Sequence, residues 1–291
     1  MSLTTAIEDY KSGNILLGVM GDPIIQSKSP IMHEAALKAL GIPGAYVPLH
    51  VIPEKLGDAV QAIRTLGFRG VNVTIPHKVT VMEHLDVIDE SALAVGAVNT
   101  IVNDNGVLTG YNTDGIGYVR SLKTEAISDL SDAKIMVIGA GGAARGIVAA
   151  LLKENPASIT IANRSIDKAQ LLAAACQGKA NVAGISMNDI GDMIHDVNVL
   201  INTTSVGMYP HMDATPIDPG LLREGMVVSD LIYNPLRTRL LLDGLERGCT
   251  IHGGLGMFVY QGAYALEYWT GKPAPTEIMR QTILNCLGGQ E

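Results

Sequence analysis

The chain has 291 residues, of which 47% are hydrophobic, and this is enough material for one large or two ordinary domains. The formal net charge of -8 argues against a protein that follows nucleic-acid phosphates, and 2 Phe and 1 Trp offer little surface for stacking bases. The 3 cysteines are widely spaced, and no signal sequence, membrane-spanning run or metal-ligand spacing is apparent. We therefore expect a cytoplasmic protein that engages no nucleic acid, membrane or metal.

The first third of the chain alternates short apolar runs with helical patterns. Asp104-Asn105-Gly106 lies between two β-type runs, which predicts a hairpin. This region therefore predicts an α/β domain without a glycine fingerprint. Strands are expected at 15–21, 45–50, 70–75, 99–102 and 107–110, and helices at 30–40, 53–66, 79–85 and 89–93.

A helix expected at 112–122 connects this region to a second α/β pattern. The alternation there predicts parallel strands with right-handed crossovers. The sequence therefore predicts two α/β domains, the second of them a Rossmann domain of residues 115–254. We expect the tail after residue 254 to return to the first domain, because the Rossmann half is complete by then. The later strands are expected at 134–138, 158–162, 197–201 and 226–232, and the later helices at 142–153, 165–176, 257–269 and from residue 276 onward.

A glycine turn follows the strand predicted at 134–138. The order of strand, glycine turn and alanine-rich helix is what a dinucleotide-binding unit needs. The first Gly allows the tight turn, the second admits the pyrophosphate, and the helix N-terminus directs N–H groups at the phosphates. The turn consists of Gly139, Ala140, Gly141, Gly142 and Ala143, with Ala144 as the small residue that packs the helix on its strand.

The tip of the next strand indicates which dinucleotide is bound. NAD sites usually carry an acidic residue there, whereas this strand ends in Asn163-Arg164-Ser165, with Lys168 one turn later. A guanidinium suits a 2′-phosphate, so the sequence favours NADP, with NAD as the alternative. The competing interpretation is that Arg164 and Lys168 are solvated surface charges, and Asp167 would soften a preference for phosphate.

Three polar clusters of the first domain follow predicted strands or precede predicted helices. In open α/β folds, ligands bind at the edge where parallel strands end. Hydroxyls and amides in such numbers suit a polyhydroxylated ligand, and Lys78 could bind a carboxylate or move a proton with Asp114 beside it. The alternatives are helix caps, turn residues and a solvated lysine. The clusters are Ser27 to Pro30, Asn72 to Lys78, and Asn99 with Asn112 to Asp114.

These residues belong to ordered motifs, and together the motifs resemble the shikimate dehydrogenase family from about residue 15 to the C-terminus. The resemblance implies reversible NADPH-dependent reduction of 3-dehydroshikimate to shikimate, a step toward chorismate and the aromatic amino acids. It also implies a three-layer α/β substrate domain of residues 1–114 plus 255–291, into which the nucleotide domain of residues 115–254 is inserted. The motifs are SKSP at 27–30, NVTIPHK at 72–78, AVNT at 97–100, NTDG at 112–115, GAGGAAR at 139–145, NRS at 163–165, NTTSVGM at 202–208, YNP at 233–235 and GMFVYQGA at 256–263.

The resemblance also implies roles for single residues. Lys78 and Asp114 would form the catalytic pair, and Ser27 and Ser29 would hold the substrate carboxylate. Tyr233 and Met257 would line the junction between substrate and nicotinamide. Thr74, Asn99 and Gln261 would bind substrate hydroxyls, and Thr203, Ser205, Met208, Gly254 and Met257 would join the glycine turn and the Asn163–Lys168 segment around the cofactor.

Two alternatives to this function stay open. Residues 1–14 before the first strand, together with 106–123, are similar to the quinate/shikimate dehydrogenase branch, which accepts quinate and often prefers NAD. A regulatory module that binds NADP without turnover is the other alternative, although such a module would not need Lys78 and Asp114. A homodimer is an assembly compatible with the sequence.

Overall fold

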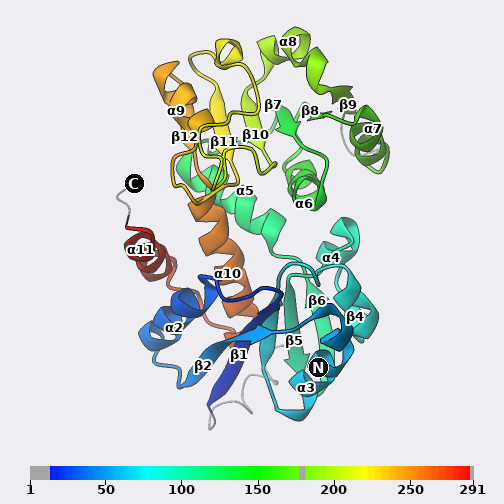
Figure 1. Cartoon of the computed structure of the whole chain (residues 1–291), viewed down its shortest axis with the longest axis vertical. Helices are drawn as coiled ribbons and strands as arrows, with labels where there is room; N and C mark the ends of the chain where they lie inside the picture. Colours follow the sequence, from blue (N-terminus) through cyan, green and yellow to red (C-terminus); the bar gives the residue numbers. More distant parts are fainter. Residues whose placement is uncertain (1–13, 177–180, 289–291) are drawn as a thin grey trace. The chain divides into compact units, whose positions relative to one another are not determined.

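The computed structural model describes residues 14–176 and 181–288, which form two compact units (Figure 1). Unit 1 comprises the chain up to Thr113 together with the part that begins at Gln261, and unit 2 runs from Asp114 to Tyr260. The boundaries expected from the sequence, after residues 114 and 254, stay predictions. Residues 1–13, which carry part of the resemblance to the quinate branch, lie outside the described residues.

The sheet of unit 2 has six parallel strands in the order β12-β11-β10-β7-β8-β9. Numbered along the chain, this is the Rossmann order 6-5-4-1-2-3, so the predicted Rossmann fold is confirmed. Both faces are buried, because Ile135 and Val137 face one helical layer while Met136 and Ile138 face the other. The strands are β7 (Lys134–Ile138), β8 (Ser158–Asn163), β9 (Asn181–Ser186), β10 (Val199–Asn202), β11 (Val227–Asp230) and β12 (Thr250–His252).

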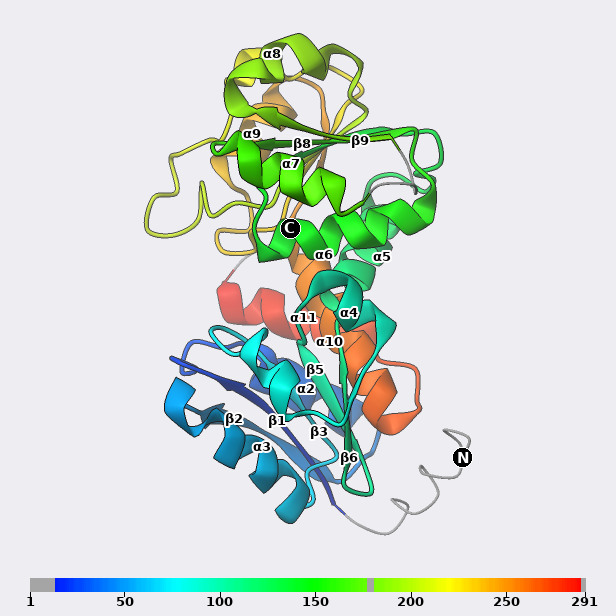
Figure 2. The same cartoon turned by 90° about the vertical axis from the view of Figure 1, so that its right-hand side faces the viewer.

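Two layers of helices cover this sheet. Apolar residues of α5, α6 and α7 pack on one face, and those of α8 and α9 pack on the other. Figure 2 shows α6 and α7 on one side of β8 and β9, with α8 on the opposite side. The helical elements are α5 (Asp114–Glu125), α6 (Gly142–Leu151), η3 (Leu152–Glu154), α7 (Ile166–Ala174), η4 (Met187–Asp189), α8 (Ile190–Met193), η5 (Ile194–Asp196), η6 (Pro219–Leu221) and α9 (Arg239–Glu246), and α10 (Gly254–Thr270) continues into unit 1.

The sheet of unit 1 is mixed, with the order β2-β1-β3-β5-β6-β4. Strands β2, β1 and β3 are parallel, and the predicted hairpin adds β5 and β6 in antiparallel register. One face is covered by α3, η2 and α4, and the other by α2, α10 and α11, which confirms the three-layer arrangement. The elements are β1 (Ile15–Gly21), α2 (Ser29–Ala39), β2 (Gly44–His50), η1 (Pro53–Lys55), α3 (Leu56–Thr65), β3 (Gly70–Val73), η2 (Thr80–His84), β4 (Val87–Ile88), α4 (Glu90–Val95), β5 (Thr100–Asp104), β6 (Val107–Tyr111) and α11 (Thr276–Leu287).

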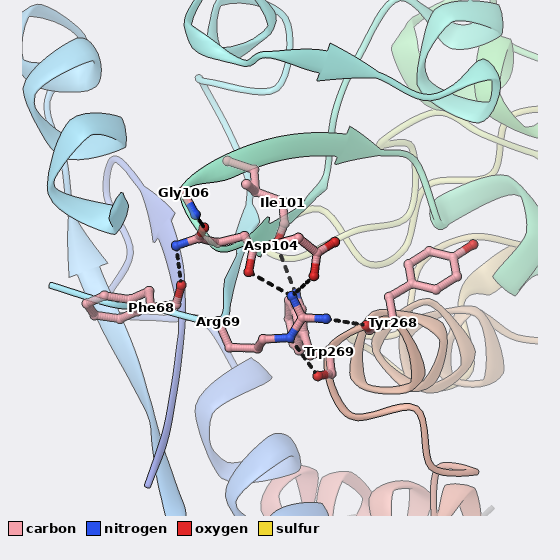
Figure 3. A network of polar contacts seen from close by, with 8 residues as sticks. Phe68, Arg69, Ile101, Asp104, Gly106, Tyr268 and Trp269 are labelled. Carbon is pink, nitrogen blue, oxygen red and sulfur yellow. Dashed lines mark hydrogen bonds and ion pairs between the residues drawn. The ribbon is translucent and has the colours of Figure 1, made fainter. Parts of the chain in front are cut away.

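A buried arginine connects the end of α10 to the sheet of unit 1 (Figure 3). Arg69 is 1% exposed, and its guanidinium donates to the carbonyl of Trp269 at 2.9 Å and to that of Asn103 at 2.7 Å. It also forms an ion pair with Asp104 at 2.6 Å and donates to the carbonyl of Tyr268 at 3.4 Å. One side chain therefore holds the β5–β6 hairpin and the last turn of α10 together.

Several short elements were not predicted from the sequence, namely β4, β9, β12, α8 and α9. The helix expected at 79–85 is the 3-10 helix η2, and the helix expected at 53–66 begins with the 3-10 turn η1. Within residues 14–176 and 181–288, no helix is long and apolar enough to cross a membrane. No group of three or more His, Cys, Asp or Glu residues in those same ranges could hold a metal ion.

Candidate active site

One edge of the sheet in unit 1 collects the predicted substrate residues. Strands β1 and β3 run parallel and end at this edge, where Met20 is paired with Val73. Strand β5 runs in the opposite direction and starts there, with Thr100 paired to Asn72 and to Tyr111, the last residue of β6. The topology therefore brings four chain segments to one edge, and they carry Ser27 and Ser29, Thr74 and Lys78, Asn99, and Asn112 with Thr113.

The two serines lie at the start of α2. Ser29 is the first residue of the helix, and its backbone N–H donates to the hydroxyl oxygen of Ser27 at 3.3 Å. The Ser29 side chain is almost buried, whereas Ser27 is half-buried. Because Ser27 accepts this hydrogen bond, its own hydroxyl proton is still available to a ligand. The cap position belongs to Lys28, which makes no side-chain cap, so the alternative in which Ser29 caps the helix is wrong.

A buried polar network lies behind this edge. The hydroxyl of Tyr46 donates to Asn72 Oδ1 at 2.7 Å, and Asn72 Nδ2 donates to the hydroxyl of Thr100 at 3.1 Å. Thr100 donates in turn to Asn99 Oδ1 at 2.9 Å, which also accepts from the backbone N–H of Thr113 at 2.9 Å. Burial raises the pKa of Tyr46, opposed by a hydrogen bond with Ser29, so the phenol stays protonated and can donate. The network fixes the amide of Asn99 in one orientation.

Lys78 follows β3 in a short loop that its neighbour holds in place. His77 is buried, and its Nε2 lies 2.6 Å from the carbonyl oxygen of Val51. The carbonyl of Lys78 accepts from the backbone N–H of Val98 at 2.7 Å, and the Lys78 side chain is half-buried. His77 therefore supports the loop, whereas Lys78 is partly accessible at the edge. Thr74, also half-buried, begins the same loop.

Gln261 reaches unit 1 from α10. The next residue, Gly262, packs so closely against α2 that an added Cβ would lie 3.2 Å from Nε2 of His33. His33 lies four residues after Ser29 on α2, so α10 passes along the first turns of that helix. The side chain of Gln261 is half-buried.

The glycine turn of unit 2 fits a dinucleotide phosphate. Gly139 has a φ of +107°, and a Cβ there would lie 2.6 Å from the Thr203 hydroxyl, so the position requires glycine. Helix α6 begins at Gly142 with Gly141 as its N-cap, and it has neither a side-chain cap nor an acidic residue in its first turn. Residues 141–143 are exposed, and as the N-cap and the first two residues of α6 their N–H groups have no intrahelical acceptor. Ala140 is half-buried, and Ala144 is buried against the strand.

The tip of β8 presents the predicted 2′-phosphate residues. Asn163 ends the strand, and its Nδ2 donates to the carbonyl of Ser165 at 2.9 Å, which shapes the turn. Ser165 is the N-cap of α7, but its hydroxyl makes no cap hydrogen bond. Arg164, Ser165 and Lys168 are all exposed there, as is Asp167. Two cations and a hydroxyl therefore gather at this tip with one carboxylate.

Two further segments carry the remaining cofactor residues. Thr203 follows β10, and its hydroxyl donates to the carbonyl of Ile138 at 2.7 Å, so the loop after β10 lies beside the glycine turn. Ser205 and Met208 of that loop are exposed. Gly254 begins α10 against the carbonyl of Leu231, where a Cβ has no room. Met257 is half-buried on the same helix and packs against the core of the α5–α7 face.

Two residues implied to lie near the reaction also belong to unit 2. Tyr233 is half-buried, and its ring stacks on that of Phe258 with centroids 4.8 Å apart. Asp114 is the first residue of α5 and is half-buried. Lys78 belongs to unit 1, so the pairing of Lys78 with Asp114 stays a prediction.

No site role was predicted for three buried polar residues behind these edges, Tyr46, Asn202 and Asp230, although Asn202 begins the 202–208 motif. Asn202 and Asp230 end neighbouring strands, and the amide of Asn202 donates to the carboxylate of Asp230 at 3.1 Å. The available signal was a polar residue directly after an apolar run, as in Val199 to Asn202. Tyr46 had no such signal, because its phenol finds Asn72 only through the sheet register.

A Rossmann unit with a glycine turn and a cationic strand tip, joined in one chain to a unit whose sheet edge carries hydroxyls, amides and a lysine, defines the class of dinucleotide-dependent oxidoreductases. Three family models match: the shikimate dehydrogenase substrate binding domain over residues 19–101, shikimate / quinate 5-dehydrogenase over 121–210, and the shikimate 5'-dehydrogenase C-terminal domain over 254–284.

Relatives match over nearly the whole length. A shikimate dehydrogenase (NADP(+)) from Geobacillus sp. is 46% identical over 274 residues, or 94% of this chain and 99% of that protein. The structure of shikimate 5-dehydrogenase from Thermus thermophilus, in complex with NADP(H) and shikimate, matches with a TM-score of 0.85 and 33% identity over 94% of this chain and 100% of that one. Quinate dehydrogenase from Corynebacterium glutamicum, in complex with NAD, matches with a TM-score of 0.87 and 31% identity over 94% and 99%. The chain belongs to the shikimate dehydrogenase family.

Proposed function

We propose that this chain catalyses the reversible reduction of 3-dehydroshikimate to shikimate with NADPH. The carrying observation is the polar edge of unit 1, where the serine hydroxyls, Thr74 with Lys78, and Asn99 lie on three of the four converging segments. Such an edge complements a ligand that has one carboxylate and several hydroxyls. Relatives named shikimate dehydrogenase (NADP(+)) support the same substrate and cofactor.

Lys78 and Asp114 form the proposed catalytic pair. When bound, NADPH supplies the hydride to the carbonyl carbon and leaves as NADP+. Lys78 donates a proton to the carbonyl oxygen, which becomes the hydroxyl, and its charge stabilises the developing alkoxide. We assign Asp114 the role of the carboxylate that orients the Lys78 amine.

The other proposed contacts divide between the two ends of the substrate. Ser27 and Ser29 hold the carboxylate, since Ser27 keeps a proton to donate. Thr74, Asn99 and Gln261 bind the hydroxyls, and Tyr233 lies near the substrate. The polar network behind Asn99 supports its role, because a fixed amide offers a constant pattern of donor and acceptor.

The cofactor contacts are proposed for unit 2. The glycine turn at 139–143 receives the pyrophosphate, and Arg164, Ser165 and Lys168 hold the 2′-phosphate with Asn163 shaping their turn. Thr203, Ser205, Met208, Gly254 and Met257 surround the nicotinamide half. We further propose a substrate domain of residues 1–114 plus 255–291 and a cofactor domain of residues 115–254.

A quinate/shikimate dehydrogenase that accepts NAD is the second candidate. The match to quinate dehydrogenase from Corynebacterium glutamicum, over 94% of this chain, favours it. The cationic tip at Arg164 and Lys168 favours the first candidate, because NAD has no 2′-phosphate for these side chains to bind. For the assembly we propose a homodimer, and light scattering of the purified chain distinguishes it from a monomer.

Steady-state rates with four substrate pairs test the function. We expect shikimate with NADP+ to give the highest kcat/KM among shikimate or quinate combined with NADP+ or NAD+. A fluorescence titration should show tighter binding of NADPH than of NADH. Arg164→Ala should reduce the ratio of the NADH Kd to the NADPH Kd by about tenfold or more. Equal affinity for both nucleotides in the unaltered chain contradicts the role of Arg164. Binding of NADPH without turnover of any cyclohexane polyol points to the regulatory alternative instead.

A further inference from the structure

Strand β11 of unit 2 ends in a wholly buried carboxylate, that of Asp230. Asp230 is 0% exposed, and it accepts hydrogen bonds from the Thr238 hydroxyl at 2.7 Å, the backbone N–H of Ile232 at 3.1 Å and Asn202 Nδ2 at 3.1 Å. All three partners donate, which suits an ionised carboxylate, because that group can only accept. Burial raises the pKa of Asp230 to about 6, and these hydrogen bonds oppose the rise. Asp230 is therefore mostly charged at pH 7.

Asn202 carries this contact into the neighbouring loop. Its Nδ2 also donates to the carbonyl of Val206 at 3.3 Å, while its Oδ1 accepts from the backbone N–H of Thr204 at 3.0 Å and from the Thr204 hydroxyl at 2.7 Å. A backbone N–H can only donate, so Oδ1 must face Thr204 and Nδ2 must face Asp230. The carboxylate thus fixes the amide, and the amide fixes the loop after β10.

The same carboxylate holds a second loop closed. Residues 231–238 leave β11 at Asp230 and return to it through Thr238, which also caps α9. The N–H of Leu231 donates to the carbonyl of Asn202 at 3.1 Å, so this second loop is tied to β10 as well. Loop 203–208 carries Thr203, Ser205 and Met208, and loop 231–238 carries Tyr233. One buried group therefore sets the geometry of both.

A purely structural role explains this arrangement poorly. A buried charge is costly to desolvate, and an apolar residue of similar volume often stabilises a core at least as well. Two donors to Asp230, the N–H of Ile232 and the hydroxyl of Thr238, come from the loop after β11. The third is the side chain of Asn202, which is paired with Asp230 in the sheet and also binds the loop after β10. The free energy that it costs to bury this charge therefore goes with the ordering of two loops at the ligand edge of the sheet.

We propose that Asp230 is a positioning residue that, directly and through Asn202, holds loops 203–208 and 231–238 in the conformation that receives the nicotinamide half of the dinucleotide. This inference rests on the proposed function, in which unit 2 binds NADP. Asp230 is wholly buried, so we assign it a positioning role rather than a contact with the cofactor. The adenosine and 2′-phosphate end is received elsewhere, by the tip of β8, so the effect of Asp230 is confined to one half of the ligand.

The test compares two ligands in the full-length chain. NADP+ contains the nicotinamide, whereas 2′,5′-ADP contains the adenosine and the 2′-phosphate without it. In Asp230→Leu, we expect the Kd of NADP+ to rise about tenfold or more while the Kd of 2′,5′-ADP stays within about threefold of the original value. A general destabilisation of unit 2 would weaken both ligands together. Unchanged NADP+ binding in a folded Asp230→Leu protein overturns the proposal.

Position 238 provides a matched pair that keeps the carboxylate in place. Thr238→Val removes the hydroxyl at nearly constant volume. We expect it to raise the ratio of the Kd of NADP+ to the Kd of 2′,5′-ADP about fivefold. Thr238→Ser retains the hydroxyl and should restore most of the original ratio. This pair decides the matter if Asp230→Leu does not fold, and equal ratios in the Val and Ser variants overturn the proposal. An unaltered chain that binds neither ligand overturns the proposed function itself.

Discussion

Lys78 is the residue on which the proposed chemistry depends most directly. We expect Lys78→Ala to lower kcat about 10²–10⁴-fold, because the developing alkoxide loses both a positive charge and a proton donor. The Kd of NADPH should change little, since Lys78 lies in unit 1 and the glycine turn lies in unit 2. Steady-state kinetics and a fluorescence titration measure the two quantities.

A lysine elsewhere in unit 1 is the matched control. Lys38 is exposed in the last turn of α2, away from the polar edge of the sheet, so Lys38→Ala should retain the original kcat. A kcat within threefold of the original in Lys78→Ala would remove this residue from the mechanism. A parallel loss in both variants would indicate damage to unit 1 as a whole.

At the level of elements, the Arg69 cluster should be the main polar anchor between α10 and the sheet of unit 1. Arg69→Met keeps most of the side-chain volume but leaves the carbonyls of Trp269, Asn103 and Tyr268 without this donor. We expect a loss of about 2–5 kcal/mol in the free energy of unfolding, because buried acceptors without partners are costly. Urea unfolding followed by Trp269 fluorescence measures it.

Arg64 provides the control at equal ion-pair distance. Its guanidinium lies 2.6 Å from Asp86, as that of Arg69 does from Asp104, but the Arg64 side chain is 22% exposed rather than 1%. Arg64→Met should therefore cost about 0–1 kcal/mol, since water screens the pair. Equal losses in the two variants would show that burial does not set the strength of the Arg69 cluster.

Elements could be predicted from sequence where a clear apolar pattern ends at a turn residue. Strand β7 was predicted with its observed bounds, Lys134–Ile138, because a run of β-branched and apolar residues buried on both faces is followed at once by glycine. Strand β9 was missed because it is only partly buried, and Gly184 interrupts its pattern. Helix α9 was missed although Thr238 caps it and Leu240 and Leu241 begin its apolar face.

The candidate site divides in a similar way. Residues directly after strands, such as Lys78 and Arg164, can be placed at the sheet edge from local patterns alone. The networks behind them cannot, because the pairing of Asn202 with Asp230 follows from the register of β10 on β11. Likewise, Tyr46 finds Asn72 only because both β2 and β3 pair with β1.

At the scale of the whole molecule, the two units should respond to acid in opposite directions. Burial lowers the pKa of His33, in unit 1, from 6.5 to about 3, and neither ring nitrogen has a hydrogen-bond partner among the described residues. Between these values the unfolded chain binds the extra proton, so unit 1 loses up to about 1.4 kcal/mol per pH unit as the pH falls from 6.5. The pKa of Asp230, in unit 2, is raised from 3.8 to about 6, so its folded form takes up the proton first. Unit 2 therefore gains stability as the pH falls from 6 toward 4.

Hydrogen exchange with mass spectrometry, corrected for intrinsic rates, measures this response because its peptides can be assigned to either unit. From pH 7 to pH 5, we expect the free energy of opening, calculated from the exchange rates, to fall in unit 1 by up to about 2 kcal/mol. In unit 2 the same free energy should rise by about 1 kcal/mol. His33→Phe should remove the pH dependence of exchange in unit 1 alone, because phenylalanine does not titrate. The phenyl ring can still stack on Tyr46, as the His33 ring does. The same direction of change in both units would contradict the prediction.

The anchoring of α10 by Arg69 has a consequence for the order in which the chain folds during synthesis. Arg69 is translated 200 residues before Trp269, whose carbonyl it binds. Unit 2 is continuous from Asp114 to Tyr260, so it can fold on the ribosome as soon as it has emerged. Unit 1 must wait for the residues from Gln261 onward, and until then Arg69 stays hydrated and its sheet lacks α10 and α11. Unit 2 can thus finish folding before unit 1, although the synthesis of unit 1 begins first.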